Sequence, residues 1–350
     1  MSGDLGVDIR VLSLAEIEAF FQKINEKSFR PKQVYEWLWK KSCRSFDEMT
    51  NLPKETREKL QQKFTFHIVT IRKTITSSDG TVKNIFHLHD GLLIEGVLIP
   101  SEGRTTACIS CQAGCSLACS FCATGQLGFT RNLLFHEICD QVVLLNNQSK
   151  QLFGSSLTNI VYMGMGEPLL NYEEVLKSVD KITSEAGLGI SPQRITISSV
   201  GIPKMIMKMA DDNVKFHFAL SLHTANNEKR TRIIPSNKKF SLEELTVALK
   251  YYHQKTKKRF TIEYILFHDF NDSIQDAREL AVFCKNFPVK INLIEYNSTH
   301  NSVFRKSQTV KVIAFKEFLE KKNLIVNTRK SRGEDIAAAC GQLALKEKSL

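Results

Sequence analysis

Five cysteines lie close together in this chain of 350 residues. They are Cys108, Cys111, Cys115, Cys119 and Cys122, and the last three form a C-x₃-C-x₂-C pattern. Three thiolates at this spacing can bind one compact ion or cluster, because sulfur ligands select zinc, copper(I) or iron–sulfur clusters. A closed zinc site takes four ligands, and the two upstream cysteines leave that alternative open. An iron–sulfur cube on the last three cysteines would leave one iron free to bind a substrate.

Glycines on both sides of these cysteines predict a loop. Gly114 precedes Cys115, and Gly125 and Gly128 follow Cys122. Glycine is the usual residue where the backbone must take unusual conformations or approach a ligand closely. The pattern therefore disfavours the alternative in which these cysteines are only small buried apolar residues.

Further polar or glycine residues follow predicted strands at several points of the chain. They are the Gly-Met-Gly-Glu-Pro run at 164–168, Ser198, Ser221 and Asn297. Glycines let the backbone approach a ligand, and Glu167 could hold an ammonium group. The hydroxyls and the amide suit ribose, carboxylate or adenine. An ordinary turn with a solvated Glu167 is the alternative, and His223 fits a core histidine equally well.

Two more residues stand out by their surroundings. Glu95 is a carboxylate in an otherwise apolar strand at 92–99, which indicates either a buried general base or the solvent face of an alternating strand. Cys340 lies between Ala339 and Gly341 near the C-terminus. By itself, Cys340 would be interpreted as a small buried residue at a helix end.

The elements that must position these residues change along the chain. Helical spacing dominates residues 1–66, with Ser13 as an N-cap and with Pro31 and Pro53 near helix starts. Period-two strands follow at 68–75, 82–88 and 92–99. Beyond residue 103, strands alternate with helices, which predicts an α/β fold with a parallel sheet and an active site at its carboxyl edge. The strands are 158–163, 194–199, 215–222, 259–266 and 289–294, and the helices are 134–147, 172–186, 202–211, 241–256, 273–286 and 309–322.

The composition excludes several classes of protein. Hydrophobic residues make up 42% and charged residues 24% of the chain, which is ordinary for a globular protein. Lys and Arg exceed Asp and Glu by 48 to 37, which indicates a polyanionic partner such as nucleic acid. No apolar run approaches the ~18 residues of a membrane span, and the first residues resemble no export signal. We therefore expect reduced thiols, no membrane partner and a cytoplasmic location.

Taken together, these motifs resemble one known family. Cys115, Cys119 and Cys122, with Phe121, are similar to the cluster motif of radical S-adenosylmethionine (SAM) enzymes, and residues 108–133 are closer still to the RlmN/Cfr adenosine methyltransferases. The resemblance extends to the runs 164–171, 197–202, 221–223 and 339–343. It implies a partial (β/α)₆ radical SAM barrel at 101–350, an N-terminal helical accessory domain at 1–66 that is expected to bind RNA, and a small β extension at 67–100.

The resemblance also implies the cofactors. A [4Fe-4S] cluster would be bound by the cysteines of the C-x₃-C-x₂-C pattern, and two SAM molecules would be used per turnover. The residues that match SAM contacts are Gly166, Glu167, Ser198, Ser221, Leu222, His223 and Asn297.

The same resemblance assigns the reaction steps. Cys340 would be methylated by a first SAM, and a radical from a second SAM would activate that methyl group for addition to the adenine. Glu95 would then remove the ring proton, and Cys108 would release the product through a transient disulfide with Cys340. It gives no role to Cys111. The remaining cysteines, at 43, 139 and 284, are expected to be structural.

The implied substrate is C2 of an adenosine in 23S rRNA, at the peptidyl transferase centre, and in tRNA, 3′ of the anticodon. C8 methylation, the Cfr reaction, is the alternative within the family, and Pro168 favours C2. A zinc-containing RNA-binding protein without catalysis is the alternative outside it. We expect a monomer that receives electrons from a flavodoxin or ferredoxin.

Overall fold

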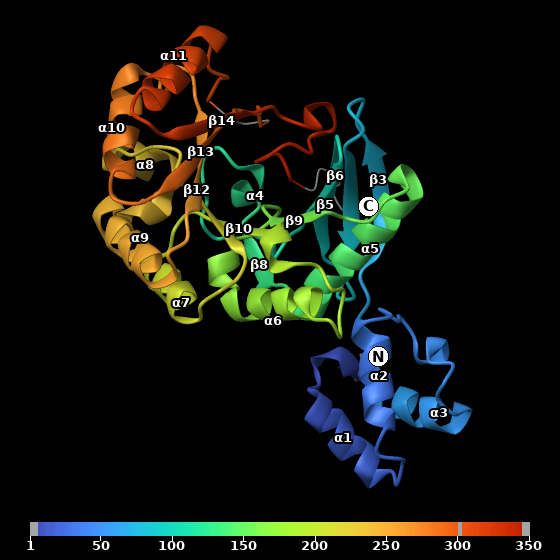
Figure 1. Ribbon diagram of the computed structural model, residues 1–350. Coiled ribbons are helices and arrows are strands. Elements are labelled where there is room, and N and C mark those ends of the chain that lie inside the picture. The colour runs from blue at the N-terminus through green and yellow to red at the C-terminus, as the bar shows by residue number, and fades with distance from the viewer. Residues whose placement is uncertain (1–5, 300–302, 345–350) are drawn as a thin grey trace.

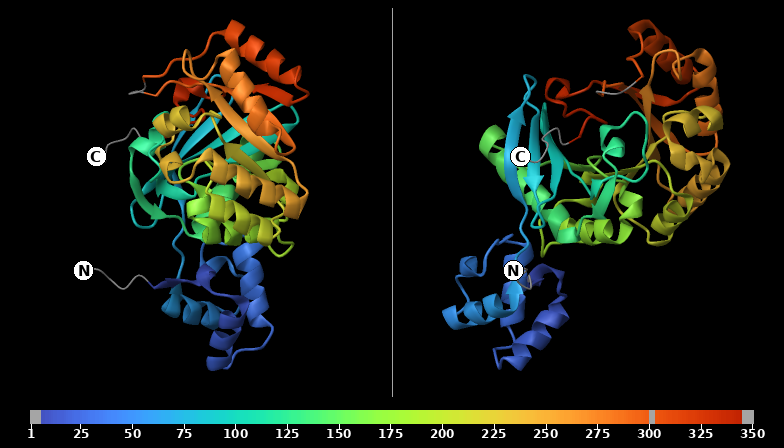
Figure 2. Two further views of the ribbon diagram at one scale, coloured as in Figure 1. Left: turned by 90° about the vertical axis from the view of Figure 1, so that its left-hand side faces the viewer. Right: turned by 180° about the vertical axis from the view of Figure 1, so that it is seen from behind.

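The computed structural model describes residues 6–299 and 303–344 (Figure 1). Residues 1–5, 300–302 and 345–350 lie outside the described part of the chain. The expectation that the first residues form no export signal falls on residues that lie outside it. A small helical unit lies at one end of the molecule, below a strongly curved sheet with helices on its outer face. The last described residues cross the inner side of this sheet (Figure 2).

The helical unit, residues 7–66, is called the accessory unit below. Its ends are joined by two short parallel strands, and its helices pack around Phe21, Leu38 and Leu60. Ser13 forms the expected capping box with Glu16. The elements are β1 (Val7–Asp8), η1 (Ile9–Val11), α1 (Leu14–Lys23), α2 (Arg30–Trp39), η2 (Phe46–Glu48), α3 (Lys54–Lys63) and β2 (Phe64–Thr65).

The main sheet has ten strands in the described residues, in the order β14-β13-β12-β11-β10-β9-β6-β5-β4-β3. The strands from β6 to β14 are parallel to one another, and β3 to β5 join them as an antiparallel meander. The bounds are β3 (Thr70–Thr76), β4 (Val82–His87), β5 (Leu93–Ser101), β6 (Arg104–Cys108), β9 (Asn159–Tyr162), β10 (Ile195–Ser199), β11 (His217–Ser221), β12 (Phe260–Leu266), β13 (Val289–Glu295) and β14 (Ile325–Arg329).

Helices follow the parallel strands in turn, which gives six β/α units within the described residues and confirms the partial barrel. The helices are α4 (Ala123–Gln126), α5 (Phe135–Phe153), α6 (Tyr172–Thr183), α7 (Pro203–Asp211), α8 (Asn227–Ile233), α9 (Leu242–Thr256), α10 (Ile274–Cys284) and α11 (Thr309–Glu320), and the short 3₁₀ turns are η3 (Pro168–Leu170), η4 (Pro192–Arg194), η5 (Pro235–Lys238) and η6 (Glu334–Ile336). No helix in the described part of the chain is long and apolar enough to span a membrane.

Six strands were not anticipated from the sequence, among them the short strands β1 and β2 of the accessory unit. The first barrel strand, β6, follows β5 after a tight turn, so the change of period near residue 100 concealed it. The edge strand β14 buries only Val326 among its five residues and therefore shows no apolar alternation. The short hairpin of β7 (Gln112–Gly114) and β8 (Phe129–Asn132) frames the cysteine loop. Since Val97 of β5 pairs with Cys108 of β6, the β meander and the barrel share one continuous sheet.

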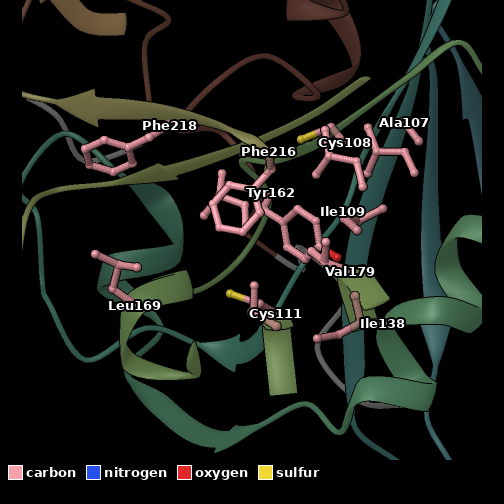
Figure 3. Close-up of a cluster of buried hydrophobic side chains, with 14 of the residues drawn as sticks. Ala107, Cys108, Ile109, Cys111, Ile138, Tyr162, Leu169, Val179, Phe216 and Phe218 are labelled. Atoms are coloured by element: carbon pink, nitrogen blue, oxygen red, sulfur yellow. The ribbon is translucent and has the colours of Figure 1, made fainter. Parts of the chain in front are cut away.

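The main hydrophobic core lies between the sheet and its outer helices (Figure 3). Tyr162, Phe216 and Phe218 are fully enclosed there. Cys111 and Cys139 are part of this core, which agrees with a packing role for both thiols.

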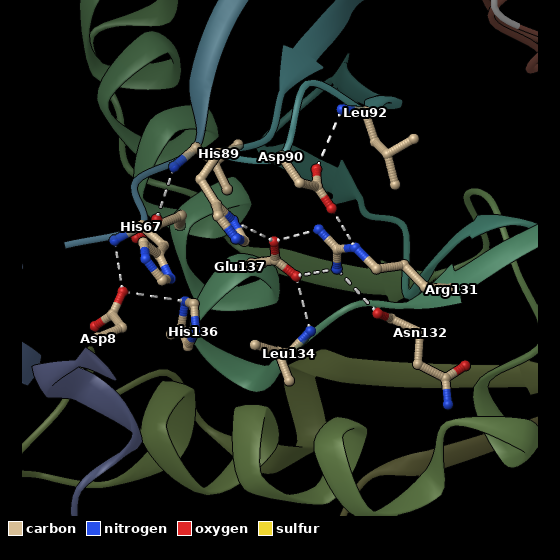
Figure 4. Close-up of polar contacts among 12 residues, drawn as sticks. Asp8, His67, His89, Asp90, Leu92, Arg131, Asn132, Leu134, His136 and Glu137 are labelled. Atoms are coloured by element: carbon tan, nitrogen blue, oxygen red, sulfur yellow. Dashed lines mark hydrogen bonds and ion pairs between the residues drawn. The ribbon is translucent and has the colours of Figure 1, made fainter. Parts of the chain in front are cut away.

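A buried ion network joins the accessory unit to the barrel, and Figure 4 shows the contacts of Asp8 with His67 and His136 beside it. Arg10 is 4% exposed and lies 2.8 Å from Asp8 and 2.7 Å from Asp140 of α5. Its guanidinium also donates to the carbonyl of His67, and the other oxygen of Asp140 accepts from the amide of Val69. One arginine thus connects the start of the accessory unit, its exit and the first long barrel helix.

Next to this network, His136 is completely buried and neither ring nitrogen has a hydrogen-bond partner in the described residues. Its Nδ1 atom lies 3.8 Å from Asp8, and burial lowers the pKa of His136 to about 4. A second cluster pairs Arg131 with Glu137 and Asp90 on the neighbouring turn.

Candidate active site

The cysteine loop is shaped by its glycines. Gly114 has a φ of +79°, and a Cβ atom there would come within 1.9 Å of the carbonyl oxygen of Gly128. The amide of Cys115 donates to that same carbonyl over 2.7 Å. The two ends of the loop are therefore held together by main-chain contacts that other residue types would prevent.

The three thiols of this loop are free and close enough to influence one another. Burial, with smaller contributions from the nearby Glu167 and Cys122 charges, raises the pKa of Cys115 to about 11. Burial and the same neighbouring thiols also raise the pKa of Cys119. Adjacent buried thiolates are unfavourable unless a metal cation offsets their charge. The donor set thus fits a metal cluster with three cysteine ligands.

Glu167 lies at the carboxyl end of β9 and is 3% exposed. Its oxygens accept from the amides of Leu169, at 2.9 Å, and Val200, at 3.0 Å, while its own amide donates to Gln112 over 2.8 Å. Burial raises its pKa. Beside it, Gly166 has a φ of +99°, and a Cβ atom there would lie 2.5 Å from the Cβ of Gln112. This turn requires glycine and keeps a carboxylate fixed next to the cysteine loop.

Two serines end neighbouring strands as expected. The Oγ atoms of Ser198 and Ser221 are 3.0 Å apart at the carboxyl ends of β10 and β11. Leu222 is fully buried, and His223 accepts from the amide of Ile265 through Nδ1 at 3.1 Å. Burial lowers the pKa of His223 to about 3, so its ring is neutral. The structure therefore shows the features of a core histidine, which was one of the two alternatives.

Residues far apart in the sequence line one cavity of about 380 Å³. Cys108 contributes from β6, Cys122 from the cysteine loop, and Asn297 follows β13. Cys340 reaches the same cavity from the segment after β14, and its carbonyl accepts from the side chain of Asn297 at 3.4 Å. The structure thus brings together the two thiols that the sequence analysis assigned to methyl transfer and release.

The walls of this cavity shift the pKa values of both thiols. Burial raises the pKa of Cys108 to about 12, and Arg329 opposes this shift. Cys340 is exposed towards the cavity, yet the enclosing walls raise its pKa, again against Arg329. Arg329 lies 3.4 Å from Glu263, a buried carboxylate fixed by Asn292 at 2.9 Å. A positive charge is therefore held beside both thiols.

Glu95 is completely buried, which excludes the solvent-face alternative. One oxygen lies 2.7 Å from Nζ of Lys83, and the other accepts from the amide of Ala344 at 2.8 Å. Glu95 lines a second cavity, of about 1150 Å³, together with Ala337. Residues 337–344, called the C-terminal loop below, separate this cavity from the one that holds the thiols.

Some participants were not identified from the sequence. Lys83 and Arg329 face the two cavities, and Gln112 supports Glu167. A signal existed for Lys83, which is a single charge in the buried strand β4, just as Glu95 is in β5. Cys111, which received no role, is 2% exposed and contacts the carbonyl of Met165, away from the thiol cavity.

Comparisons with known proteins agree with this geometry. Residues 7–66 match the family model "Ribosomal RNA large subunit methyltransferase N-terminal domain", and residues 109–281 match "Radical SAM superfamily". A "Probable dual-specificity RNA methyltransferase RlmN" from Cytophaga hutchinsonii is 54% identical, covering 97% of this chain and 93% of the relative. The protein of that name from Christiangramia forsetii is 52% identical over 97% of this chain and 96% of its own length.

A solved structure extends the comparison to three dimensions. The crystal structure of a radical SAM methyltransferase from Sphaerobacter thermophilus has a TM-score of 0.90 and 36% identity, covering 96% of this chain and 99% of that protein. Both domains, the cysteine loop and the full-length similarity thus lead to one conclusion: the chain belongs to the RlmN family of dual-specificity RNA methyltransferases, within the radical SAM superfamily.

Proposed function

We propose that this RNA methyltransferase modifies C2 of an adenosine in 23S rRNA, at the peptidyl transferase centre, and in tRNA, 3′ of the anticodon. One observation carries the proposal. Cys108 and Cys340 lie more than two hundred residues apart in the sequence and line a single cavity beside Cys122 of the cysteine loop. A reaction that needs two protein thiols and a cluster at one place requires this arrangement.

The proposed cluster ligands are Cys115, Cys119 and Cys122. When bound, a [4Fe-4S] cluster there supplies the electron that cleaves SAM into a carbon radical. The proposed SAM contacts surround the loop at the carboxyl ends of the barrel strands, where Glu167 keeps capacity to accept from an ammonium group. They are Gly166, Glu167, Ser198, Ser221, Leu222, His223 and Asn297, with His223 as a rigid wall.

Cys340 is the proposed methyl carrier. Its thiolate forms a bond to the methyl carbon while the bond from that carbon to the sulfonium sulfur breaks, which is covalent catalysis by displacement. Arg329 favours the thiolate electrostatically. Because this methylation consumes one SAM and radical formation consumes another, we propose two SAM molecules per turnover.

Glu95 and Cys108 complete the proposed cycle. Once the adenine is bonded to the carrier, Glu95 accepts the proton from C2, and the one electron left on the adduct would return to the cluster. The Cys108 thiolate then attacks the sulfur of Cys340, so that the bond from this sulfur to the methylene carbon breaks, a protein disulfide forms and the released carbon takes a proton to become the methyl group. Since Glu95 faces the cavity on the other side of the C-terminal loop, this loop must shift before Glu95 can reach the ring.

The accessory unit is the proposed second contact with RNA. Its basic stretch at residues 27–44 carries four exposed lysines that are available for phosphates, namely Lys27, Lys32, Lys40 and Lys41. Arg30 and Arg44 of the same basic stretch instead bond the carbonyls of Asn51 and Val69, which is a structural use. The net charge of +11 agrees with an RNA substrate.

The remaining participants complete the proposal. A flavodoxin or ferredoxin is the proposed electron donor, and the enzyme is proposed to act as a monomer. Because ribosomal and transfer RNA are its proposed substrates, we place the reaction in the cytoplasm. Pro168, which opens the turn after Glu167, supports the C2 branch over C8 methylation.

The test is product analysis with the full chain, purified anaerobically and with its cluster reconstituted. RNA containing the target adenosine is reacted with SAM and a reductant, digested to nucleosides and analysed by mass spectrometry against both methyladenosine standards. We expect 2-methyladenosine and loss of deuterium from adenosine labelled at C2. Formation of 8-methyladenosine would assign the Cfr reaction, and stoichiometric zinc without methylation would support the non-catalytic alternative.

A further inference from the structure

Lys83 connects parts of the protein that the reaction must coordinate. It lies on β4, is 5% exposed, and places its Nζ atom 2.7 Å from Oε1 of Glu95 and 3.2 Å from the carbonyl oxygen of Ala337. The second oxygen of Glu95 accepts from the amide of Ala344 at 2.8 Å. Both ends of the C-terminal loop are therefore attached to the same buried ion pair.

Cys340 lies between these two attachments. The middle of the loop touches the cysteine loop through Gly341, whose carbonyl accepts from the amide of Ala123 at 2.8 Å, and Gln342 donates to the carbonyl of Ser298 at 3.0 Å. The position of Cys340, the proposed methyl carrier, thus depends on the Glu95 carboxylate and the Lys83 ammonium group, which contact the two ends of the C-terminal loop.

The pair is matched in charge and little exposed to water. Lys83 and Glu95 share one face of the sheet, because Glu95 pairs with Ile85 and Lys83 pairs with Val97 across β4 and β5. The other charged groups of this cavity are Lys73, Glu334 and Asp335. A buried carboxylate that loses a close ammonium partner is strongly disfavoured, so Lys83 holds Glu95 in its present place.

We propose that Lys83 is a positioning residue of the methyl transfer, which together with Glu95 docks the loop that carries Cys340. The effect of this docking on the reaction rests on the proposed function. When Glu95 takes the C2 proton, the C–H bond breaks and the proton resides on the carboxyl group, so the charge that holds Lys83 disappears. The shifted loop then cannot dock again, and Cys340 stays free to move towards Cys108.

The first experiment measures loop docking without RNA or SAM. Amide hydrogen exchange of peptides covering 338–344 is followed in the full chain with its cluster reconstituted. Lys83→Met should accelerate exchange there at least tenfold, while peptides from β9 to β11 keep the wild-type rate. Lys83→Arg should restore slow exchange, because an arginine retains the charge, and a general weakening of the fold would not be rescued in this way.

Lys229→Met is the matched control, since Lys229 lies 2.6 Å from Asp276, another buried carboxylate, in a different part of the barrel. It should leave the loop peptides unchanged. Should Lys83→Met fail to fold, the double variant Lys83→Met/Glu95→Gln removes both charges and should still free the loop. Unchanged exchange in 338–344, or equal acceleration in the Lys229 control, would overturn the inference.

A second measurement connects docking to the reaction. Mass spectrometry of Cys340 after incubation with SAM alone should show at least tenfold slower methylation in Lys83→Met. If the wild-type protein is never methylated at Cys340, the proposed function fails, whatever the exchange result. If the wild type is methylated and Lys83→Met is methylated equally fast with an undocked loop, the positioning role fails and the proposed function stands.

Discussion

The barrel and the accessory unit use charged residues in opposite ways. In the barrel and the β meander that continues its sheet, Glu167, Glu95 and Lys83 are nearly inaccessible to water and each is held by named contacts. In the accessory unit, Lys40 and Lys41 are exposed, and Lys41 lies 3.8 Å from the ring centre of Trp37. Buried charges need fixed partners, whereas exposed charges can meet a partner from solution.

The difference teaches that chemistry and RNA attachment are separable in this protein. The two regions meet at Arg10, which is buried between Asp8 and Asp140. This buried ionic joint would fix the position of an RNA, bound by the accessory unit as proposed, relative to the barrel. The comparison therefore predicts variants that damage one region and leave the other intact.

The largest effect is expected in the cysteine loop. Cys119→Ala removes one of the three proposed ligands and should abolish both iron binding and cleavage of SAM, while RNA affinity stays within about twofold of wild type. Cys284→Ala is the matched control, because Cys284 is equally buried but lies on α10. Iron content and the release of 5′-deoxyadenosine are measured. Cleavage retained by Cys119→Ala would refute the ligand assignment.

The next effect concerns the proposed base. Glu95→Ala should slow product release by roughly 10²–10⁴-fold, the range for loss of general base catalysis, and should accumulate a protein–RNA adduct. Denaturing gels with labelled RNA report the adduct, and filter binding should show unchanged RNA affinity. Normal turnover without adduct would remove Glu95 from the mechanism.

The joint should make stability depend on pH. Burial lowers the pKa of His136 to about 4 from an ordinary value of 6.5. The unfolded chain therefore binds more protons between these values, and the free energy of unfolding should fall by about 3 kcal/mol as the pH drops from 6.5 to 4. Urea titrations across this range measure the change, and His136→Leu should flatten it. An equally steep dependence in that variant would assign the effect to other groups.

The smallest effect is expected on the surface of the accessory unit. Replacing Lys40 and Lys41 by glutamate should weaken RNA binding several-fold. The slope of the logarithm of the binding constant against the logarithm of the salt concentration should become shallower by ~0.7–0.9 per lost phosphate contact. Cluster content and SAM cleavage should not change. Equal affinity for RNA at every salt concentration would show that this surface does not contact the substrate.

Local signals in the sequence predicted much of the fold. Ser13, Pro31 and Pro53 marked the helix starts because capping and fixed φ values act within a few residues. The alternation of strands and helices predicted the parallel sheet, and the family resemblance added the partial barrel. The edge strand β14 could not be found in this way, because a strand exposed along most of its length lacks the apolar pattern.

The candidate site was predictable where a motif carries it and not where distant segments meet. The cysteine loop and Glu167 lie in short runs of sequence. The pairing of Lys83 with Glu95 depends on the register of two antiparallel strands, and Arg329 reaches the thiols only because β14 ends beside them. Register and long-range packing are not encoded in local periodicity, so these contacts emerge only from the structure.

The central claim is that Cys108 and Cys340 act in sequence on one substrate. Cys108→Ala leaves methylation of Cys340 and addition to the adenosine possible, but it removes the thiol that releases the product. The variant is reacted with labelled RNA and SAM, and any shifted band on a denaturing gel is mapped by mass spectrometry, with Cys111→Ala as control. The account predicts a covalent RNA adduct on Cys340 in Cys108→Ala and none in the control. Normal turnover by Cys108→Ala, or an adduct at any other residue, would contradict it.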